Sequence, residues 1–137
     1  GRGEKRTLPM AARLADGWNA AYVSAEEFER LNGVLDAACE RIGRDPSEIE
    51  RAVNLSFDLT VSEADRPAAE QAFVETWGPM AERAMPGAIF GTPEQAIDVV
   101  AAYSEAGADL INIALRAPVD PDALSGYLEV TVPALRN

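Results

Sequence analysis

The chain alternates between two hydrophobic periodicities, one typical of strands and one typical of helices. Residues 52–59 alternate strictly between large apolar side chains and small or polar ones, which predicts a strand with two unlike faces. Residues 18–22 and 110–115 alternate in the same way over shorter lengths and predict two more strands. Between these segments, apolar residues recur every three or four positions, which predicts helices with one buried face.

Capping residues indicate where the helices begin and end. Ser24 stands three residues before Glu27, and Thr92 stands three residues before Gln95, which is the spacing of a capping box. Helices are therefore predicted from Ser24 to about residue 42 and from Thr92 to the glycine at 107. The same signals predict helices after Thr7 as a cap, at 45–50 with Asp45 as its cap, from Ser62 with a kink near Pro67, and over 122–135.

The order of elements predicts an α/β fold with a parallel sheet. An inner strand of a doubly wound sheet is apolar on both faces, whereas the inner face of a barrel strand can line a site. The polar face of 52–59 therefore favours a barrel, with an edge strand that has one solvated face as the alternative. The segment 78–90, rich in Gly, Pro and Met, is predicted to be irregular.

Three strands do not close a barrel, because the common form needs eight. Open sheet edges also invite association with other strands. The chain is therefore expected to need a missing N-terminal half-barrel, in the same parent chain or a companion chain, or to form a homo-oligomer.

The composition excludes several kinds of partner and several kinds of catalytic or metal site. Its 137 residues are 47% apolar, as expected of one domain with a core, and its net charge of −11 argues against nucleic acid and anionic membranes as partners. A single cysteine, Cys39, and the absence of histidine exclude an internal disulfide, a histidine triad and a Cys/His zinc site, so no metal site is expected. No segment reads as a signal peptide or membrane span, and a cytoplasmic location is expected.

The first eight residues, GRGEKRTL, combine two glycines with the start of a predicted helix. Glycines let backbone N–H groups approach an anion closely, and a helix start adds the positive end of its dipole. Taken alone, this Gly-x-Gly pattern favours an ordinary loop over a phosphate site.

Four segments, in this order, resemble the C-terminal half of the luciferase-like oxidoreductases: GRGEKRTLPMAARLADGWN, ACERIGRDPSEIERAVNL, GTPEQAIDVVAAYSEAGAD and VPALR. This TIM-barrel superfamily includes bacterial luciferase, flavin-dependent monooxygenases and deazaflavin-dependent dehydrogenases, and the segments are most similar to the deazaflavin-dependent branch. The resemblance spans residues 1–136. It implies that residues 1–137 form the C-terminal half of a (β/α)8 barrel, with its strands six to eight, and that the N-terminal half is absent.

The resemblance implies an oxidoreductase or monooxygenase that uses a deazaflavin coenzyme of the F-420 type or FMN on a small-molecule substrate. The opening loop then holds the coenzyme phosphate, and Trp18 and Asn19 lie beside it at the end of their strand. The loop positions that match the family are Gly1, Arg2, Gly3, Glu4 and Thr7. Arg2 departs from the usual glycine run and either adds a bidentate phosphate contact or blocks the close approach.

Most residues that contact the reactive edge of the coenzyme belong to the absent half, so the chain alone is expected to be inactive. The alternative is a non-catalytic half-barrel, or a degenerate family member, that serves in binding or assembly.

Polar residues on the predicted strands are candidate substrate contacts, although polar packing on an inward face is the more common explanation. Asn54, Ser56 and Asp58 share one face of their strand, and Asn112 and Arg116 are placed similarly at the last strand. Asp58 is the only carboxylate on this face; if it is buried, its pKa should rise, which suits proton transfer.

Three large or reactive side chains, Trp18, Cys39 and Trp77, have a structural explanation. Trp18 is explained equally well as a core residue, and Cys39 is expected in the core. Trp77, together with 78–90, is expected to cover the barrel or to meet a partner.

Overall fold

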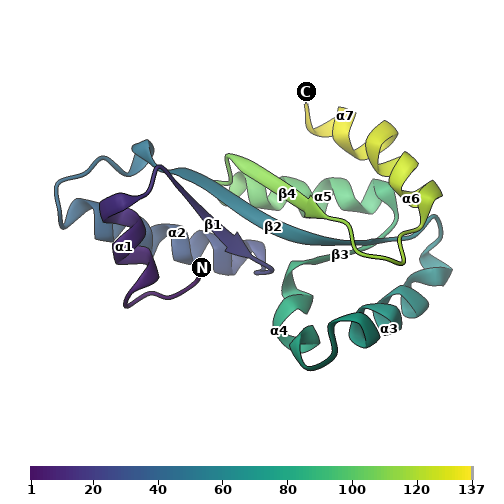
Figure 1. Cartoon of the computed structure of the whole chain (residues 1–137). Helices are drawn as coiled ribbons and strands as arrows, with labels where there is room; N and C mark the ends of the chain where they lie inside the picture. The colour runs from purple at the N-terminus through teal and green to yellow at the C-terminus, as the bar shows by residue number, and fades with distance from the viewer. Residues whose placement is uncertain (137) are drawn as a thin grey trace.

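One long strand, β2 (Glu50–Leu59), organises the sheet in the computed structural model, which describes residues 1–136 (Figure 1). Three shorter parallel strands pair with it: β1 (Gly17–Ala21), β3 (Ala88–Gly91) and β4 (Leu110–Ala114). The fold is thus an open, parallel α/β sheet, as the order of elements predicted.

β1 and β3 lie end to end along one edge of β2, and β4 lies along the other. The Tyr22 N–H donates to the Asn54 carbonyl at 2.9 Å, and the Thr60 N–H donates to the Gly91 carbonyl at 2.9 Å. On the opposite edge, the Asp109 N–H donates to the Arg51 carbonyl at 2.8 Å. Even and odd residues of a strand direct their main-chain groups to opposite edges, so both edges of β2 are occupied. The edge-strand alternative for 52–59 is therefore wrong.

β3 is a fourth strand that the hydrophobic pattern did not predict. The segment expected to be irregular forms two 3-10 turns (Gly78–Met80 and Met85–Gly87) around the short helix α4 (Ala81–Ala84), and then runs into β3. Four residues after a Gly/Pro-rich stretch are too few for an alternation to stand out.

Most capping predictions are confirmed. The Ser24 side chain accepts from the Glu27 N–H at the start of α2 (Ala25–Glu40), and both bonds of the Thr92–Gln95 capping box are present at the start of α5 (Pro93–Glu105). Thr7 is the exception, because it is the first residue of α1 (Thr7–Leu14), and the preceding Arg6 makes no side-chain cap bond.

Two helices differ from their predicted form. Pro67 causes no kink, because it is the second residue of α3 (Arg66–Trp77), which follows a 3-10 turn at Glu63–Asp65. The last helix consists of α6 (Pro121–Gly126), a π-helical turn (Tyr127–Thr131) and α7 (Val132–Leu135). Within residues 1–136, no helix has the length and apolar character needed to cross a bilayer.

The apolar face of β2 carries the main core. α1, α2, α5 and the last helix pack on Val53, Leu55, Phe57 and Leu59, all of which are nearly inaccessible to solvent. Cys39 is buried in this core, as expected.

Among residues 1–136, the other face is covered only near the carboxyl ends of β2 and β3. There, α3 and α4 form a second, smaller core around Phe73, which contacts Phe90 of β3 with ring centroids 5.6 Å apart. Figure 1 shows α3 and α4 on the opposite side of the sheet from α5, α6 and α7.

A buried arginine fixes the amino end of β2. The Arg51 guanidinium is 9% exposed and donates to Asp36 Oδ1 at 2.8 Å and to the carbonyls of Pro46 and Ile49 at 3.0 Å each. The Arg51 N–H donates to Asp109 Oδ2 at 2.7 Å. The guanidinium thus joins α2 to the turn before β2, and the Arg51 backbone joins β2 to the residue before β4, at the end of the sheet opposite α3.

The junction between β1 and β3 gives a stability prediction. A Cβ added at Gly87 would clash with Tyr22 Cα and stand 2.6 Å from the Tyr22 carbonyl carbon, which are backbone atoms that cannot move aside. Gly87→Ala should therefore lower the free energy of unfolding by about 1–3 kcal/mol in a urea titration.

Gly33→Ala is the matched control, because an added Cβ at this exposed position within α2 meets no atom within 4 Å. It should raise stability by about 0.5–1 kcal/mol through helix propensity. Equal effects of the two substitutions would contradict the end-to-end placement of β1 and β3.

Candidate functional site

Three asparagines cross the uncovered face of the sheet. Asn54 on β2 pairs in register with Asn112 on β4, and it neighbours Asn19 on β1. With the Asn19 amide oriented to suit its neighbours, Asn54 Nδ2 donates to Asn19 Oδ1 at 3.3 Å. Asn19 and Asn112 are exposed and Asn54 is half-buried, so this face presents amide groups beside a central strand.

Ser56 and Asp58 continue the polar face toward the carboxyl end of β2, where α3 covers them. Ser56 Oγ and Asp58 Oδ2 are buried and have no hydrogen-bond partner among the described residues. Burial raises the pKa of Asp58, and the nearby Ser56 hydroxyl opposes part of the rise. The condition set for Asp58 is thus met in part: the residue is half-buried, and burial shifts its pKa upward.

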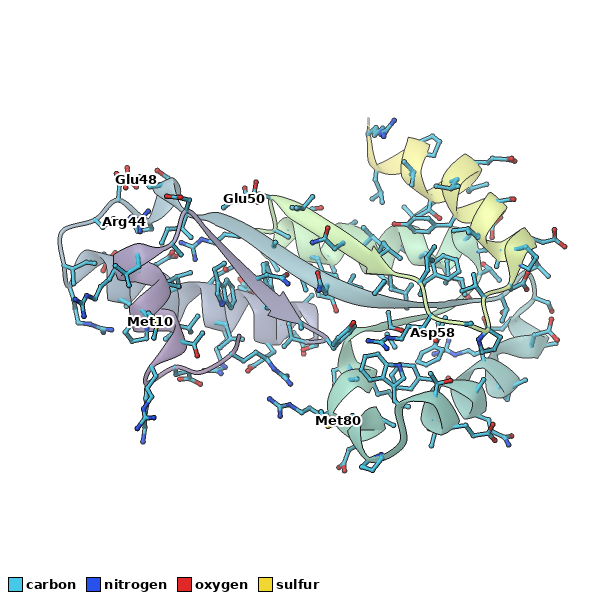
Figure 2. The ribbon with its side chains drawn as sticks, viewed as in Figure 1. Met10, Arg44, Glu48, Glu50, Asp58 and Met80 are labelled. Atoms are coloured by element: carbon cyan, nitrogen blue, oxygen red, sulfur yellow. The ribbon has the colours of Figure 1, made fainter. Side chains whose placement is uncertain are left out.

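A cavity of about 330 Å³ lies between the end of β2, α3 and the segment after β4; we call it the α3 cavity. Figure 2 shows Asp58 between the sheet and α3. The residues that line the cavity are Phe57–Thr60, Asp65, Ala68, Ala69, Ala72, Phe73, Thr76, Trp77 and Arg116–Asp120. The α3 side of the cavity is mostly alanine, whose small side chains leave the space open.

Trp77 separates this cavity from a second one. The Arg116 guanidinium lies over the Trp77 ring, 4.4 Å from its centroid, and Trp77 also contacts Phe73 and Tyr22 through ring pairs at 5.4 and 4.7 Å. The second cavity, of about 370 Å³, is called the loop-side cavity here. It is lined by Gly1, Arg2, Ala21, Tyr22, Trp77, Met80, Arg83 and Ala84.

The opening loop is held against β1. The Gly1 nitrogen donates to the Asn19 carbonyl at 2.8 Å, and Trp18 Nε1 donates to the Gly1 carbonyl at 2.7 Å. A Cβ at Gly3 would stand 2.7 Å from Thr7 Oγ1, so only glycine fits this turn without a shift. Residues 3–7 line a further hollow of about 550 Å³.

Charges around the loop favour an anion. Glu4 is the only acidic residue in the opening loop, and the Arg30 guanidinium bonds its carboxylate at 2.8 Å. Lys5 and Arg6 are exposed beside it, and neither they nor Arg2 form an ion pair with any residue in 1–136. The local balance is therefore positive in a chain whose net charge is −11.

The structure corrects the expected position of Trp18. It is the second residue of β1, not its end, and it points to the apolar face, where it is 4% exposed and stacks on Phe28 at 5.6 Å. Asn19 is the third residue of β1 and faces the other way. Trp18 is thus a core residue that anchors the loop through its indole N–H.

The remaining predicted residues fall into three groups. Gly1, Arg2, Gly3, Glu4 and Thr7 form the loop, and Asn19, Asn54 and Asn112 form the amide row. Asp58 and Arg116 line the α3 cavity, whereas Ser56 is buried beside Asp58 and does not line it. Sequence reasoning missed Tyr22, which directly follows β1 and has a positive φ of 56°. A non-glycine residue in this region is uncommon and often marks a functional site.

No protein-family model matches the chain, and no curated protein sequence matches it. Solved structures do match. A coenzyme F-420-dependent secondary alcohol dehydrogenase, in complex with an F-420–acetone adduct, superposes with a TM-score of 0.76 at 16% identity, covering 100% of this chain and 48% of that chain.

Two further structures match over most of the chain. The coenzyme F-420-dependent tetrahydromethanopterin reductase of Methanopyrus kandleri superposes with a TM-score of 0.68 at 17% identity, covering 97% of this chain and 49% of that chain. The long-chain alkane monooxygenase LadA superposes with a TM-score of 0.70 at 18% identity, covering 99% of this chain and 39% of that chain.

The chain therefore has the fold of about half of each of these structures, and the predicted α/β fold class with a parallel sheet is confirmed. It spans about half the length, or less, of each of these structures.

The role of Trp18 gives a prediction for the loop. Trp18→Phe keeps the ring stack on Phe28 but loses the bond to the Gly1 carbonyl. We expect hydrogen exchange in residues 3–8 to accelerate several-fold, with a stability loss of about 1 kcal/mol. Amides in α5 serve as the internal control, and unchanged exchange in the loop would show that Trp18 does not anchor it.

The burial of Asp58 gives a prediction for pH dependence. Its pKa is raised in the folded state, so ionisation destabilises the fold as pH rises from the unfolded pKa through the folded one. Asp58→Asn removes this loss, and its free energy of unfolding relative to wild type should rise over that interval.

Asp45→Asn is the control of opposite sign, because the Ser47 N–H lowers the pKa of Asp45. The stability that Asp45 contributes is present above its unfolded pKa and is lost as pH falls through the folded pKa, so this variant should lose stability relative to wild type as pH rises. Parallel curves for the two variants would contradict the burial of Asp58.

Proposed function

We propose that this chain belongs to the luciferase-like oxidoreductases and forms the C-terminal half of their barrel, in which β1, β2 and β4 are strands six, seven and eight. The observation that carries the proposal is the polar face of β2. This strand is hydrogen-bonded on both edges and packed by helices on its other face, yet it presents Asn54, Ser56 and Asp58. A central strand of this kind suits the lumen of a barrel and does not suit a doubly wound sheet.

The opening loop fits the phosphate of the coenzyme. Gly3 permits a close turn over Thr7, whose hydroxyl has no hydrogen-bond partner within residues 1–136, and Lys5 and Arg6 supply positive charge. α1 begins at Thr7 and returns to the start of β1, so its N-terminus and the loop lie at the carboxyl end of that strand. Anions are favoured at such an end by the helix dipole and by backbone N–H groups.

The coenzyme is a deazaflavin of the F-420 type or FMN, and when bound it supplies the hydride or electron chemistry. A deazaflavin is favoured, because the resemblance is strongest to that branch and two of the matched structures carry F-420 in their names. The residues of this chain hold the phosphate, present the amide row to the ring or substrate, and use α3 and Trp77 to exclude water.

The rest of the barrel completes the site. The outer edges of β1 and β4 have no strand beside them within residues 1–136, and Leu110 and Leu115 are 45% and 52% exposed near β4. The N-terminal half, in the same parent chain or a companion chain, or a second copy of this chain, covers these edges.

A non-catalytic role in binding or assembly is the second candidate. Arg2, in place of a glycine in the loop, favours it. Binding of the coenzyme through the loop distinguishes the two roles.

Fluorescence titration with coenzyme F-420 and with FMN tests the proposal. Wild-type chain should bind at least one of them, and inorganic phosphate should compete. Gly3→Ala places a methyl group against Thr7 Oγ1 and should weaken binding at least about tenfold, which is roughly 1.4 kcal/mol. Gly33→Ala, where an added Cβ meets no atom within 4 Å, should bind as wild type does. If neither coenzyme binds, or if Gly3→Ala binds normally, the phosphate role is wrong.

A further inference from the structure

Two arginines in the loop-side cavity have no protein partner. Arg2 and Arg83 both line this cavity, and within residues 1–136 neither guanidinium forms a hydrogen bond or an ion pair. A guanidinium presents its N–H donors in a planar fork that matches the two oxygens of a carboxylate. The opening loop and α4, which are far apart in the sequence, thus each supply one such fork to the same cavity.

No carboxylate of the described residues lines the loop-side cavity, although the chain holds 23 acidic residues against 12 basic ones. Bonding by Arg30, at 2.7 and 2.9 Å, lowers the pKa of Glu27, and the charge of Arg2 adds to this effect from beyond ion-pair distance. Glu27 is therefore already paired with Arg30 and leaves Arg2 open. The two unpaired cations make the cavity locally positive, which favours an anion.

The remaining wall of the loop-side cavity is largely apolar. The Tyr22 ring contacts the Trp77 ring with centroids 4.7 Å apart, and Met80, labelled in Figure 2, is 49% exposed. A methionine at such a site adapts to the shape of an apolar ligand. The volume of about 370 Å³ is at the lower end for small-molecule sites. These features together suit a compact apolar body that carries one anionic group.

This cavity is distinct from the hollow that the coenzyme phosphate is proposed to occupy. Residues 3–7 line that hollow, whereas Arg2 and Gly1 line the loop-side cavity. Phosphate itself has no apolar surface to place against Tyr22, Trp77 and Met80. A carboxylate on a hydrocarbon or aromatic body matches both the arginines and the apolar wall.

We propose that the loop-side cavity binds an organic monocarboxylate, whose carboxylate pairs with Arg2 and Arg83 and whose apolar body contacts Tyr22, Trp77 and Met80. Under the proposed function, on which this step rests, the carboxylate is the substrate, because Gly1 and Arg2 of the coenzyme loop line the cavity. Arg2 and Arg83 then determine specificity, since an uncharged analogue leaves both guanidinium groups without a counter-charge.

Benzoate is a suitable probe, because it is compact and carries one carboxylate. NMR titration of the chain at neutral pH should give a dissociation constant of about 10 mM or tighter, with amide shifts centred on residues 21–22 and 77–84. Benzamide has the same ring without the charge and should bind at least about threefold more weakly. Acetate has the carboxylate without the ring and should bind at least about tenfold more weakly.

Three arginine variants make the test specific. Arg2→Gln and Arg83→Gln should each weaken benzoate binding about threefold or more and should leave benzamide binding unchanged. Arg13→Gln is the matched control, because Arg13 is exposed, forms no ion pair within residues 1–136 and does not line this cavity. It makes the same change in net charge and should bind benzoate as wild type does. An otherwise unaltered amide spectrum shows that each variant is folded.

The inference is overturned if benzoate does not bind, if benzamide or acetate binds equally well, or if all three arginine variants behave alike. Displacement of benzoate by inorganic phosphate, by coenzyme F-420 or by FMN would show that the cavity belongs to the coenzyme site, and would also overturn it. Coenzyme binding is measured separately, with Gly3→Ala. Coenzyme binding without benzoate binding would refute only this inference. Benzoate binding without coenzyme binding would refute the coenzyme role and leave the carboxylate site in place.

Discussion

The placement of β2 at the centre of the sheet is the constraint on which the rest of the structure depends. Both edges of this strand are hydrogen-bonded, so its alternating side chains must face two different environments. On one face, Val53, Leu55 and Phe57 pack against α2, α5 and the last helix in the main core. The opposite face therefore carries Asn54, Ser56 and Asp58. Because β2 is a central strand, these polar residues are not explained by the exposure of an edge strand to solvent.

Much of this arrangement follows from local sequence signals, because caps and alternation act over a few residues. Ser24 and Thr92 define the two long helices, and the pattern of 52–59 shows both faces of β2. β3 was missed because four residues carry little periodicity, and its pairing with β2 is set by contact between distant segments. Trp18 was placed at the wrong end of its strand: it is the second residue of β1, and its burial against Phe28 is a tertiary contact that a five-residue alternation does not show. The covering of Asp58 by α3 is likewise a tertiary contact that no local pattern shows.

The two ends of the sheet have different roles. At the amino end, Arg51 and its partners are satisfied and bind the elements together. At the carboxyl end, the buried oxygens of Ser56 and Asp58 lack partners, Tyr22 is in an uncommon conformation, and cavities flank Trp77. Barrel enzymes divide stability and activity between the same two ends. The chain shares its fold with about half of each matched structure, and identities of 16–18% show the fold alone.

The most direct test of the account is a map of amide shifts in the chain on addition of coenzyme F-420, and separately of FMN. The account predicts that shifts gather in the loop at residues 1–7 and on the side-chain amides of Asn19, Asn54 and Asn112. Residues around Arg51, at the amino end of the sheet, should not respond. Shifts confined to that amino end, or to the outer helices α2 and α5, would contradict the claim that the polar face of β2 is the functional face.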